Sequence, residues 1–200
     1  MSSPHHEPVS RRERNKQEKL ARITAAAREL FAERGVDEVT TQQIAEKADI
    51  GTGTLFLYAK TKGELLLLVQ NSTYGEALER GRALASGIED TLDAVMAIVR
   101  PVVECNRKQV DNGRTYLREI VFGDPQELHH GVALGLIAET EAEIASVLTR
   151  GGNVEPERAA LTAHIVSAIM FVAMAATTNA EKTIDDVVEE ITAQIRLLLT

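Results

Sequence analysis

The side chains best suited to binding chemistry lie in one stretch of the sequence, TTQQIAEKADIGTGTLFLYAKTKGEL, residues 40–65. Hydroxyl and amide groups there could donate hydrogen bonds to phosphate oxygens or to base edges. The two helix starts expected at Thr40 and Lys62 would add free backbone N–H groups, which suit phosphate anions. The stretch therefore favours contact with nucleic acid. Its first candidates are Thr40, Gln42, Gln43, Thr52, Thr54 and Lys62.

The same stretch has the spacing of two short helices joined by a tight turn. Thr40 precedes Gln43 by three residues, a capping box that predicts a helix over residues 41–48. Asp49 tolerates the left-handed region, so residues 49–51 can form the turn before a second helix over residues 52–58. Small or apolar residues fall where such helices would touch, namely Ile44, Ala45, Ala48, Ile50 and Leu55. The pattern predicts a helix-turn-helix unit whose second helix enters a major groove, with an ordinary helical hairpin as the alternative.

The net charge of −8 is unevenly distributed along the chain. Residues 1–62 hold 11 Lys and Arg against 9 Asp and Glu, a balance of +2, whereas residues 63–200 hold 11 against 21, a balance of −10. An acidic total therefore does not exclude a nucleic-acid partner. Residues 1–15 are expected to form a flexible basic arm, from which Arg12 could reach the minor groove of DNA. The alternative for this arm is a solubilising tail.

Helical periodicity recurs in almost every long segment, which predicts an all-α protein of about nine helices. Further caps are expected at Thr61, Ser86 and Thr183, and turns at 112–113 and 123–125, with Pro125 at the first helical position. The helices are expected over about residues 14–34, 41–48, 52–58, 62–85, 87–110, 114–122, 125–150, 156–178 and 184–198. We expect an amino-terminal domain at 16–62 and a larger helical domain at 63–200.

Over about residues 16–68 the sequence resembles the amino-terminal signature of TetR (tetracycline-repressor) family transcription regulators. The residues that carry the resemblance are Thr40-Thr41, Ile44-Ala45, Ile50-Gly51, Gly53-Thr54-Leu55-Phe56-Leu57-Tyr58, Lys62 and Leu65. The resemblance adds Thr41, Gly53 and Tyr58 to the expected DNA contacts. The family commonly has Tyr at the position of Phe56 and Tyr or His at that of Leu57, and Leu57 cannot donate a hydrogen bond. The expected backbone contacts therefore shift to Thr40, Thr41, Thr54, Tyr58 and Lys62.

Residues 159–180 carry no charged side chain over a length that could cross a bilayer. Polar residues such as His164 and Asn179 interrupt the segment, and no basic cluster flanks it. We therefore expect it to be buried between its own domain and a partner subunit. The last helix, residues 184–198, has an apolar stripe and is expected to take part in the same interface. Two helices from each protomer would form a four-helix dimer interface, which the resemblance also implies.

The sequence offers little for catalysis. The adjacent His129 and His130 would point about 100° apart on a helix, so they do not form a metal-binding pair, and a surface or pocket-lining position is expected. Cys105 and His164 are expected to be core or interface residues, and one cysteine allows no intrachain disulfide. We expect no enzyme activity, no metal and no cofactor.

An effector pocket is expected among the middle helices, where apolar side chains could wall a cavity. Its candidates are Met96, Val103, Tyr116, Ile120, Ile137, Phe171 and Met174. The acidic second domain favours an apolar or cationic compound over a polyanion. Taken singly, each of these residues is better explained as plain core.

These observations predict a homodimeric, cytoplasmic, ligand-responsive regulator, most simply a repressor, that binds a palindromic DNA operator through residues 52–58. A small-molecule effector of unknown identity would release the DNA, and no membrane is involved. A helical ligand-binding or scaffold dimer without an operator is the alternative, and an unrecognised helical enzyme is a more distant one.

Overall fold

The computed structural model describes residues 10–150, 152 and 154–199. Within them the chain forms nine α-helices, a short 3-10 helix and no strand, which confirms the all-α prediction. The helices are α1 (Arg11–Arg34), α2 (Thr41–Lys47), α3 (Thr52–Leu55), α4 (Lys62–Ala85), α5 (Thr91–Arg107), α6 (Val110–Phe122), α7 (Leu128–Thr149), α8 (Pro156–Ala175) and α9 (Ile184–Leu198), with η1 (Thr177–Asn179) between the last two.

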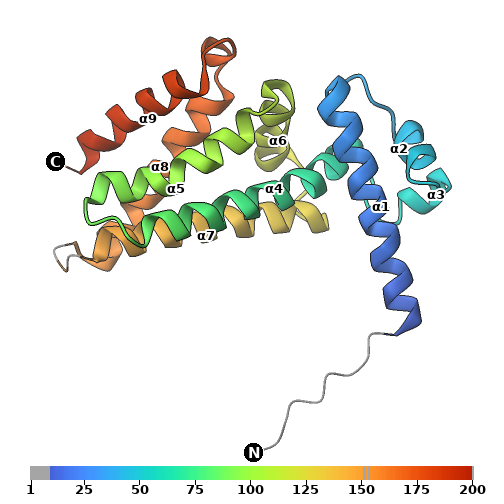
Figure 1. The fold of residues 1–200 in the computed structure, drawn as a ribbon, viewed down its shortest axis with the longest axis horizontal. Helices are drawn as coiled ribbons and strands as arrows, with labels where there is room; N and C mark the ends of the chain where they lie inside the picture. The colour runs from blue at the N-terminus through green and yellow to red at the C-terminus, as the bar shows by residue number, and fades with distance from the viewer. Residues whose placement is uncertain (1–9, 151, 153, 200) are drawn as a thin grey trace, which may run out of the picture.

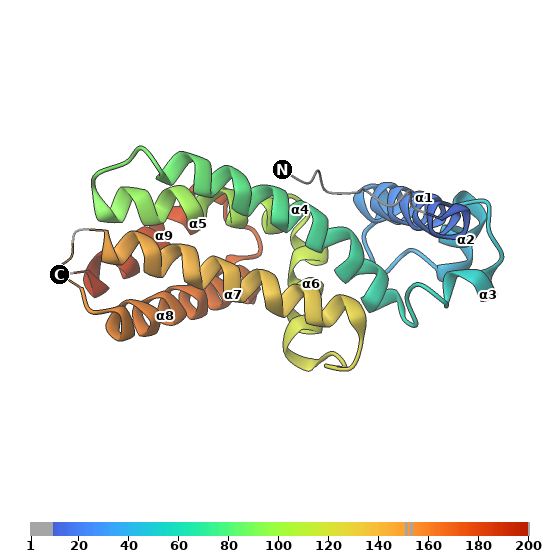
Figure 2. The same cartoon turned by 90° about the horizontal axis from the view of Figure 1, so that it is seen from below.

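The helices form two parts that share α4 (Figures 1 and 2). Helices α1 to α3 make the amino-terminal unit, residues 10–59, and α4 runs from it along the larger domain. In that domain α4 packs most extensively on α5 and then on α7, and α7 in turn packs on α8. The amino-terminal unit therefore stands at one end of an elongated molecule, where it can contact a partner of its own.

Helix α4 is buried on several sides, as its LLLLV run suggests. Leu65 and Leu66 have no exposed surface, and each such burial contributes about 2 kcal/mol. Farther along, a Cβ on Gly81 would lie 2.8 Å from the Cα of Ile98, so this glycine allows α4 and α5 to touch along their backbones. The close contact fixes the last part of α4 against α5 within the larger domain.

Several expected helix ends are confirmed by their caps. The Thr40 hydroxyl accepts from the backbone N–H of Gln43 at 3.2 Å, and the Gln43 side chain accepts from the N–H of Thr40 at 2.9 Å. Thr183 and Asp186 form the same reciprocal pair at the start of α9. Thr61 caps α4 by accepting from the N–H of Glu64 at 3.0 Å. These local signals are strong because a capped start satisfies otherwise free backbone donors.

Two predicted boundaries around α5 and α6 are wrong. Asp90, not Ser86, caps α5 by accepting from the N–H of Asp93. The break after α5 falls at residues 108–109, and Asn112 and Gly113 lie in the first turn of α6. A Cβ on Gly113 would be 2.1 Å from the carbonyl oxygen of Asn106, so this glycine serves close packing rather than a turn.

Other predicted boundaries shift by a few residues. Helix α1 begins at Arg11, capped by Ser10, so the described part of the expected flexible arm is helical, and residues 1–9 lie outside the described residues. Helix α3 ends at Leu55, and turns continue the segment to Tyr58. Helix α7 begins at Leu128 rather than at Pro125, and α8 ends at Ala175 rather than near residue 178.

Candidate nucleic-acid interface and effector cavity

The turn between α2 and α3 sets the angle of the recognition segment, which we define as residues 52–59. Asp49 takes a left-handed conformation with φ of 53°, as the sequence predicts for this position. The Ile50 N–H then donates to the carbonyl oxygen of Ala45 at 3.0 Å, and Ile44, Ala45 and Leu55 are buried where the helices meet. The predicted apolar contacts thus hold the recognition segment against α2.

The polar residues predicted to contact DNA lie on or beside this segment. They differ in whether their side chains are free to donate a hydrogen bond to DNA. Gln43 and Thr40 are engaged with each other in the cap, and Gln42 donates to Glu46 at 2.9 Å. Thr41, Thr52 and Thr54 are half-buried, whereas Gly53 is exposed with no other atom near the position of a Cβ. A partner's backbone could therefore approach α3 most closely at Gly53.

Two further predicted contacts also have structural partners. The Lys62 ammonium donates to the carbonyl oxygen of Asp37 at 3.1 Å, which ties the loop after α1 to the start of α4. The Tyr58 hydroxyl is within 3.5 Å of the carbonyl oxygen of Lys16, so it points toward α1 rather than into the core. Both side chains hold the unit together as well as facing its surface.

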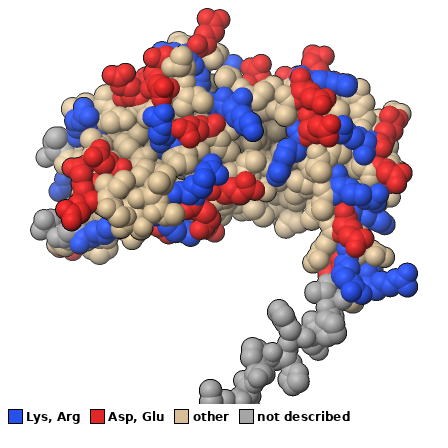
Figure 3. Space-filling view, viewed as in Figure 1, with Lys and Arg blue, Asp and Glu red and all other residues tan. Residues whose placement is uncertain are grey.

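A basic cleft lies between the first turns of α1 and the recognition segment. It has a volume of about 1010 Å³, and none of its four cations has an ion pair among the described residues. Figure 3 shows Lys and Arg side chains gathered at this end of α1. The cleft is lined by Arg11, Arg12, Glu13, Asn15, Lys16, Lys19, Thr54, Leu57 and Tyr58. It brings Arg12 beside Thr54 and Tyr58, as a phosphate-binding surface requires.

The recognition segment also exposes apolar side chains for which the sequence pattern indicates no role. Leu57 is 83% exposed and Phe56 is 43% exposed. Large apolar groups so open to solvent mark contact surfaces. The departure of Leu57 from the family pattern was the signal available in the sequence.

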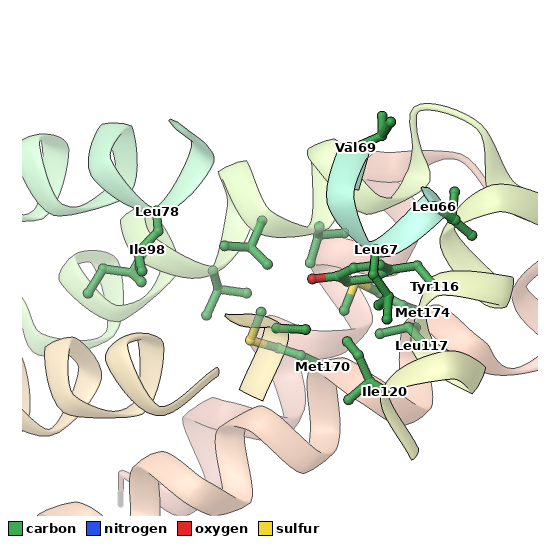
Figure 4. Close-up of a cluster of buried hydrophobic side chains, with 14 of the residues drawn as sticks. Leu66, Leu67, Val69, Leu78, Ile98, Tyr116, Leu117, Ile120, Met170 and Met174 are labelled. Carbon is green, nitrogen blue, oxygen red and sulfur yellow. The ribbon is translucent and has the colours of Figure 1, made fainter. Parts of the chain in front are cut away.

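The larger domain has a partly open apolar cavity of about 190 Å³ between α4, α6, α7 and α8, which we call the effector cavity. It is lined by Tyr74, Leu117, Ile120, Ile137, Glu141, His164, Ser167, Ala168, Met170, Phe171 and Met174. Figure 4 shows Leu117 and Ile120 of α6 beside Met170 and Met174 of α8. Four of the seven predicted effector residues line this cavity.

The other three predicted effector residues lie elsewhere. Tyr116 is buried in the core, and its hydroxyl donates to Asn71 at 2.9 Å. Val103 is fully buried in the core. Met96 lies on α5 in a different surface pocket, which Leu84 and Val188 also line. Periodicity places all three on inward faces, but only packing decides which inward residues border an open space.

Polar groups sit at the edges of the effector cavity. The Tyr74 hydroxyl and the Thr140 hydroxyl are 2.9 Å apart, and burial raises the pKa of Tyr74 to about 12 although this hydrogen bond opposes the shift. His164 is exposed, and its Nδ1 lies 3.0 Å from Glu141 Oε1. The cavity therefore has an apolar interior with hydrogen-bonding groups at its margin.

Apolar side chains also cover the outer face of α8. Leu161, Ile165 and Val172 are exposed there, and Leu197 is exposed on α9. Among the described residues, one helix, α8, is long enough and apolar enough to cross a membrane by length and composition. A third of its most apolar 18-residue segment is buried inside the protein. Because α8 packs on α7 and α9 through its other face, a partner subunit could cover the exposed residues.

Groups with potential for chemistry are isolated in the part of the chain that the structure describes. No three His, Cys, Asp or Glu residues there could hold a metal ion. His129 and His130 are buried rather than on the surface or lining the cavity, and each ring faces a backbone carbonyl. Burial raises the pKa of Cys105, which keeps its thiol protonated near neutral pH.

Known proteins resemble this chain in the region of the helix-turn-helix unit. The model of the tetR family of bacterial regulatory proteins matches residues 23–69. The fatty acid metabolism regulator protein of Bacillus subtilis (strain 168) is 33% identical over 67 residues, 34% of each chain. The match thus spans about a third of that relative's length.

Solved structures are similar over nearly the whole chain. Thermus thermophilus FadR, a TetR family transcriptional repressor in complex with lauroyl-CoA, is 26% identical with a TM-score of 0.71, over 90% of this chain and 93% of that one. A TetR transcriptional regulator from Rhodococcus sp. RHA1 shares the fold, at 17% identity and a TM-score of 0.72, over 93% and 98%. These proteins are regulators and not enzymes, in agreement with the sequence analysis. Over residues 23–69 the chain thus matches the tetR family, and over nearly its whole length it has the fold of TetR-family transcriptional regulators.

Proposed function

We propose that the protein is a homodimeric repressor that binds a palindromic operator through residues 52–58 and is released by an effector in the larger domain. The observation that carries the proposal is the basic cleft, where cations of α1 that have no ion pair within the described part of the chain line one surface with Thr54 and Tyr58. Cations supply affinity for phosphates, and the exposed face of α3 supplies access to bases. The cytoplasm is the compartment that this role requires.

The outer face of α8 and its neighbour α9 support the proposed dimer. The exposed Leu161, Ile165 and Val172 fall on one side of α8, which is the pattern of a helix that packs on a second copy. A two-fold axis between protomers requires two half-sites of opposite orientation. Their centres should lie about 34 to 36 Å apart, or a multiple of that distance.

The proposed effector is a fatty acyl-CoA, whose acyl chain would occupy the effector cavity. The nearly all-apolar lining suits an alkyl chain, and two proteins similar to this one are a fatty acid metabolism regulator and a repressor in complex with lauroyl-CoA. This proposal keeps the expected apolar character of the ligand but departs from the preference against a polyanion, since CoA carries phosphates.

The proposal is tested by selecting sequences from a random duplex pool with the full-length protein. We expect a recovered palindrome, and a log–log salt slope of about −5 if each protomer neutralises about three phosphates. Arg12→Ala should make that slope shallower by about 2, because each protomer loses one contact. Lys182→Ala removes the same charge from an exposed pair with Glu190 and should leave the slope unchanged.

A pool without enrichment, or a slope that Arg12→Ala and Lys182→Ala change equally, would contradict operator binding through the basic cleft. The first result would favour a helical ligand-binding dimer instead. Lauroyl-CoA should lower the affinity for the recovered operator, and a repressor that ignores it has another effector.

A further inference from the structure

Two side chains of the larger domain, Asn112 and His129, form hydrogen bonds with the backbone of the amino-terminal unit. Asn112 is 3% exposed and His129 is 7% exposed. They stand in the first turns of α6 and α7, two helices that wall the effector cavity. Buried hydrogen bonds are costly to break, so the two contacts fix the unit to these particular helices.

Asn112 holds the end of α1. Its Nδ2 donates to the carbonyl oxygen of Phe31 at 2.8 Å, and its Oδ1 accepts from the N–H of Val36 at 2.7 Å. These bonds satisfy backbone groups on both sides of Gly35, which has φ of 79°. The orientation of α1 is thus tied to the start of α6.

The adjacent histidines make a second connection through α7. His129 Nε2 lies 3.0 Å from the carbonyl oxygen of Tyr58, in the recognition segment. His130 Nε2 lies 2.9 Å from the carbonyl oxygen of Ile120, a residue that lines the effector cavity. A carbonyl oxygen only accepts, so both Nε2 atoms carry the hydrogen and donate it.

Neighbouring groups hold this pair of histidines in place. Asn71 Nδ2 of α4 donates to the His129 carbonyl oxygen at 2.8 Å, and the Tyr116 hydroxyl of α6 donates to Asn71 Oδ1 at 2.9 Å. The His129 N–H is directed at Glu64 Oε2, 3.4 Å away. Helix α4 thus holds the backbone of residue 129 directly, and α6 supports that contact through Tyr116 and Asn71.

The size of the effector cavity shows how a ligand would move these helices. Its volume of about 190 Å³ is below the 300 to 1,000 Å³ or so of ligand pockets. An acyl chain that fills more than this volume inside the domain must displace a wall, and the Ile120 backbone that His130 holds belongs to that wall. Displacement of α6 relative to α7 would change the distance between the points where Asn112 and His129 hold the amino-terminal unit.

We propose that His129 and His130 are positioning residues that couple occupancy of the effector cavity to the orientation of the recognition segment, because they join the carbonyl oxygens of Ile120 and Tyr58 through one peptide unit. This coupling rests on the proposed function and specifies its regulation. Asn112 holds α1 during the change, so movement of Tyr58 rotates α3 relative to α1. The two operator-bound segments of a dimer then lose their matched spacing.

The coupling is tested with two amide substitutions at one position. His129→Gln places a donor close to the position of the imidazole Nε2, whereas the donor of His129→Asn is one methylene short of the Tyr58 carbonyl. Operator affinity is measured with and without saturating lauroyl-CoA, and lauroyl-CoA binding is measured separately by calorimetry. Asn179→Ala is the control, since it removes a buried hydrogen bond to Ala173 inside the larger domain.

In the wild type, lauroyl-CoA should weaken operator binding by about 5- to 150-fold, the usual range of such couplings. His129→Asn should reduce that factor to below about threefold while lauroyl-CoA still binds, and His129→Gln and Asn179→Ala should keep it. Undiminished coupling in His129→Asn, or equal loss in Asn179→Ala, would overturn the proposal.

A second measurement does not depend on the effector. Ser167→Leu adds an apolar side chain to the cavity lining and stands in for a ligand. Relative to the wild type, Ser167→Leu should raise the rate of amide hydrogen exchange of residues 51–59. In a protein that already carries His129→Asn, Ser167→Leu should cause no such rise. If Ser167→Leu leaves exchange there unchanged, or raises it equally with His129→Asn, the coupling is refuted. If only the response to lauroyl-CoA is missing, the proposed effector is wrong and the coupling stands.

Discussion

Two glycines of this chain have opposite surroundings, and the difference separates their roles. Gly53 lies on exposed α3 with no other atom within 4 Å of the position of a Cβ. Gly113 lies at the start of α6, where a Cβ would collide with the backbone of Asn106. Both have negative φ, so neither is required for backbone conformation. Gly113 is therefore needed for folding, and Gly53 is available for a close approach by DNA.

Alanine at these two positions should give opposite results in denaturation and DNA-binding measurements. Gly113→Ala should lower the free energy of unfolding by about 1 to 3 kcal/mol or more, because the α5–α6 junction must separate. Gly53→Ala should leave that free energy equal or raise it by up to about 1 kcal/mol, because alanine favours the helix. It should nonetheless weaken operator binding at least about fivefold. Unchanged operator affinity in Gly53→Ala would remove Gly53 from the interface.

At the scale of the element, hydrogen bonds in the first turn of α9 set the residue at which this helix begins. Thr183 Oγ1 accepts from the Asp186 N–H at 3.1 Å, and the Asp186 carboxylate accepts from the Thr183 N–H at 2.9 Å and from its hydroxyl at 2.7 Å. These hydrogen bonds lower the pKa of Asp186 from its ordinary value of 3.8. A lowered pKa stabilises the folded state above the unfolded value, and this contribution is lost as the pH falls through the folded value.

Thr183→Ala should lower the free energy of unfolding by about 1 kcal/mol at pH 7, because the start of α9 loses its cap. The loss should shrink as the pH falls below about 4, because the unfolded chain then binds a proton at Asp186 before the folded chain does, and the part of it due to the carboxylate should vanish once folded Asp186 is protonated too. Urea denaturation at fixed protein concentration over pH 3 to 7 measures both effects, and Thr183→Ser is the control that retains the hydroxyl. A difference independent of pH would mean that the carboxylate takes no part in the cap.

At the scale of the whole molecule, the basic cleft and the apolar outer face of α8 lie on different parts of the protein. The cations of α1 that line the cleft lie at the amino-terminal unit, whereas exposed apolar side chains cover α8. A dimer formed through α8 would leave both basic clefts free to face one DNA duplex. This arrangement explains how a chain with net charge −8 can still bind DNA.

Val172→Glu should convert the proposed dimer to a monomer. Val172 is 65% exposed in the protomer, and burying an unpaired carboxylate at an interface costs about 3 kcal/mol, which raises the dimer dissociation constant about 100-fold. Sedimentation checks this, and operator binding should weaken together with dimerisation. Leu84→Glu, at a 59% exposed position at the end of α4, should leave the mass unchanged. A dimeric Val172→Glu would place the interface elsewhere.

The sequence determined the local features of this protein. The caps at Thr40 and Thr183, the turn at Asp49 and the apolar faces of the helices depend on residues within a few positions of one another, so their spacing was enough to predict them. The same local pattern located the helix-turn-helix stretch and its family resemblance. The boundaries near Asn112 and Gly113 were missed, because an Asn-Gly pair that usually marks a turn is here used for contacts with Phe31 and Asn106.

Tertiary structure decided what depends on residues far apart in the chain. Whether Tyr116, Val103 or Ile137 borders the cavity is set by how α6, α5 and α7 pack, and a period of 3.6 residues gives only the inward direction. The roles of His129 and His130 depend on carbonyl groups 71 and 10 residues away, which the sequence around them does not reveal. Local spacing fixes which side chains face inward, but only the packed chain brings their partners within hydrogen-bonding distance.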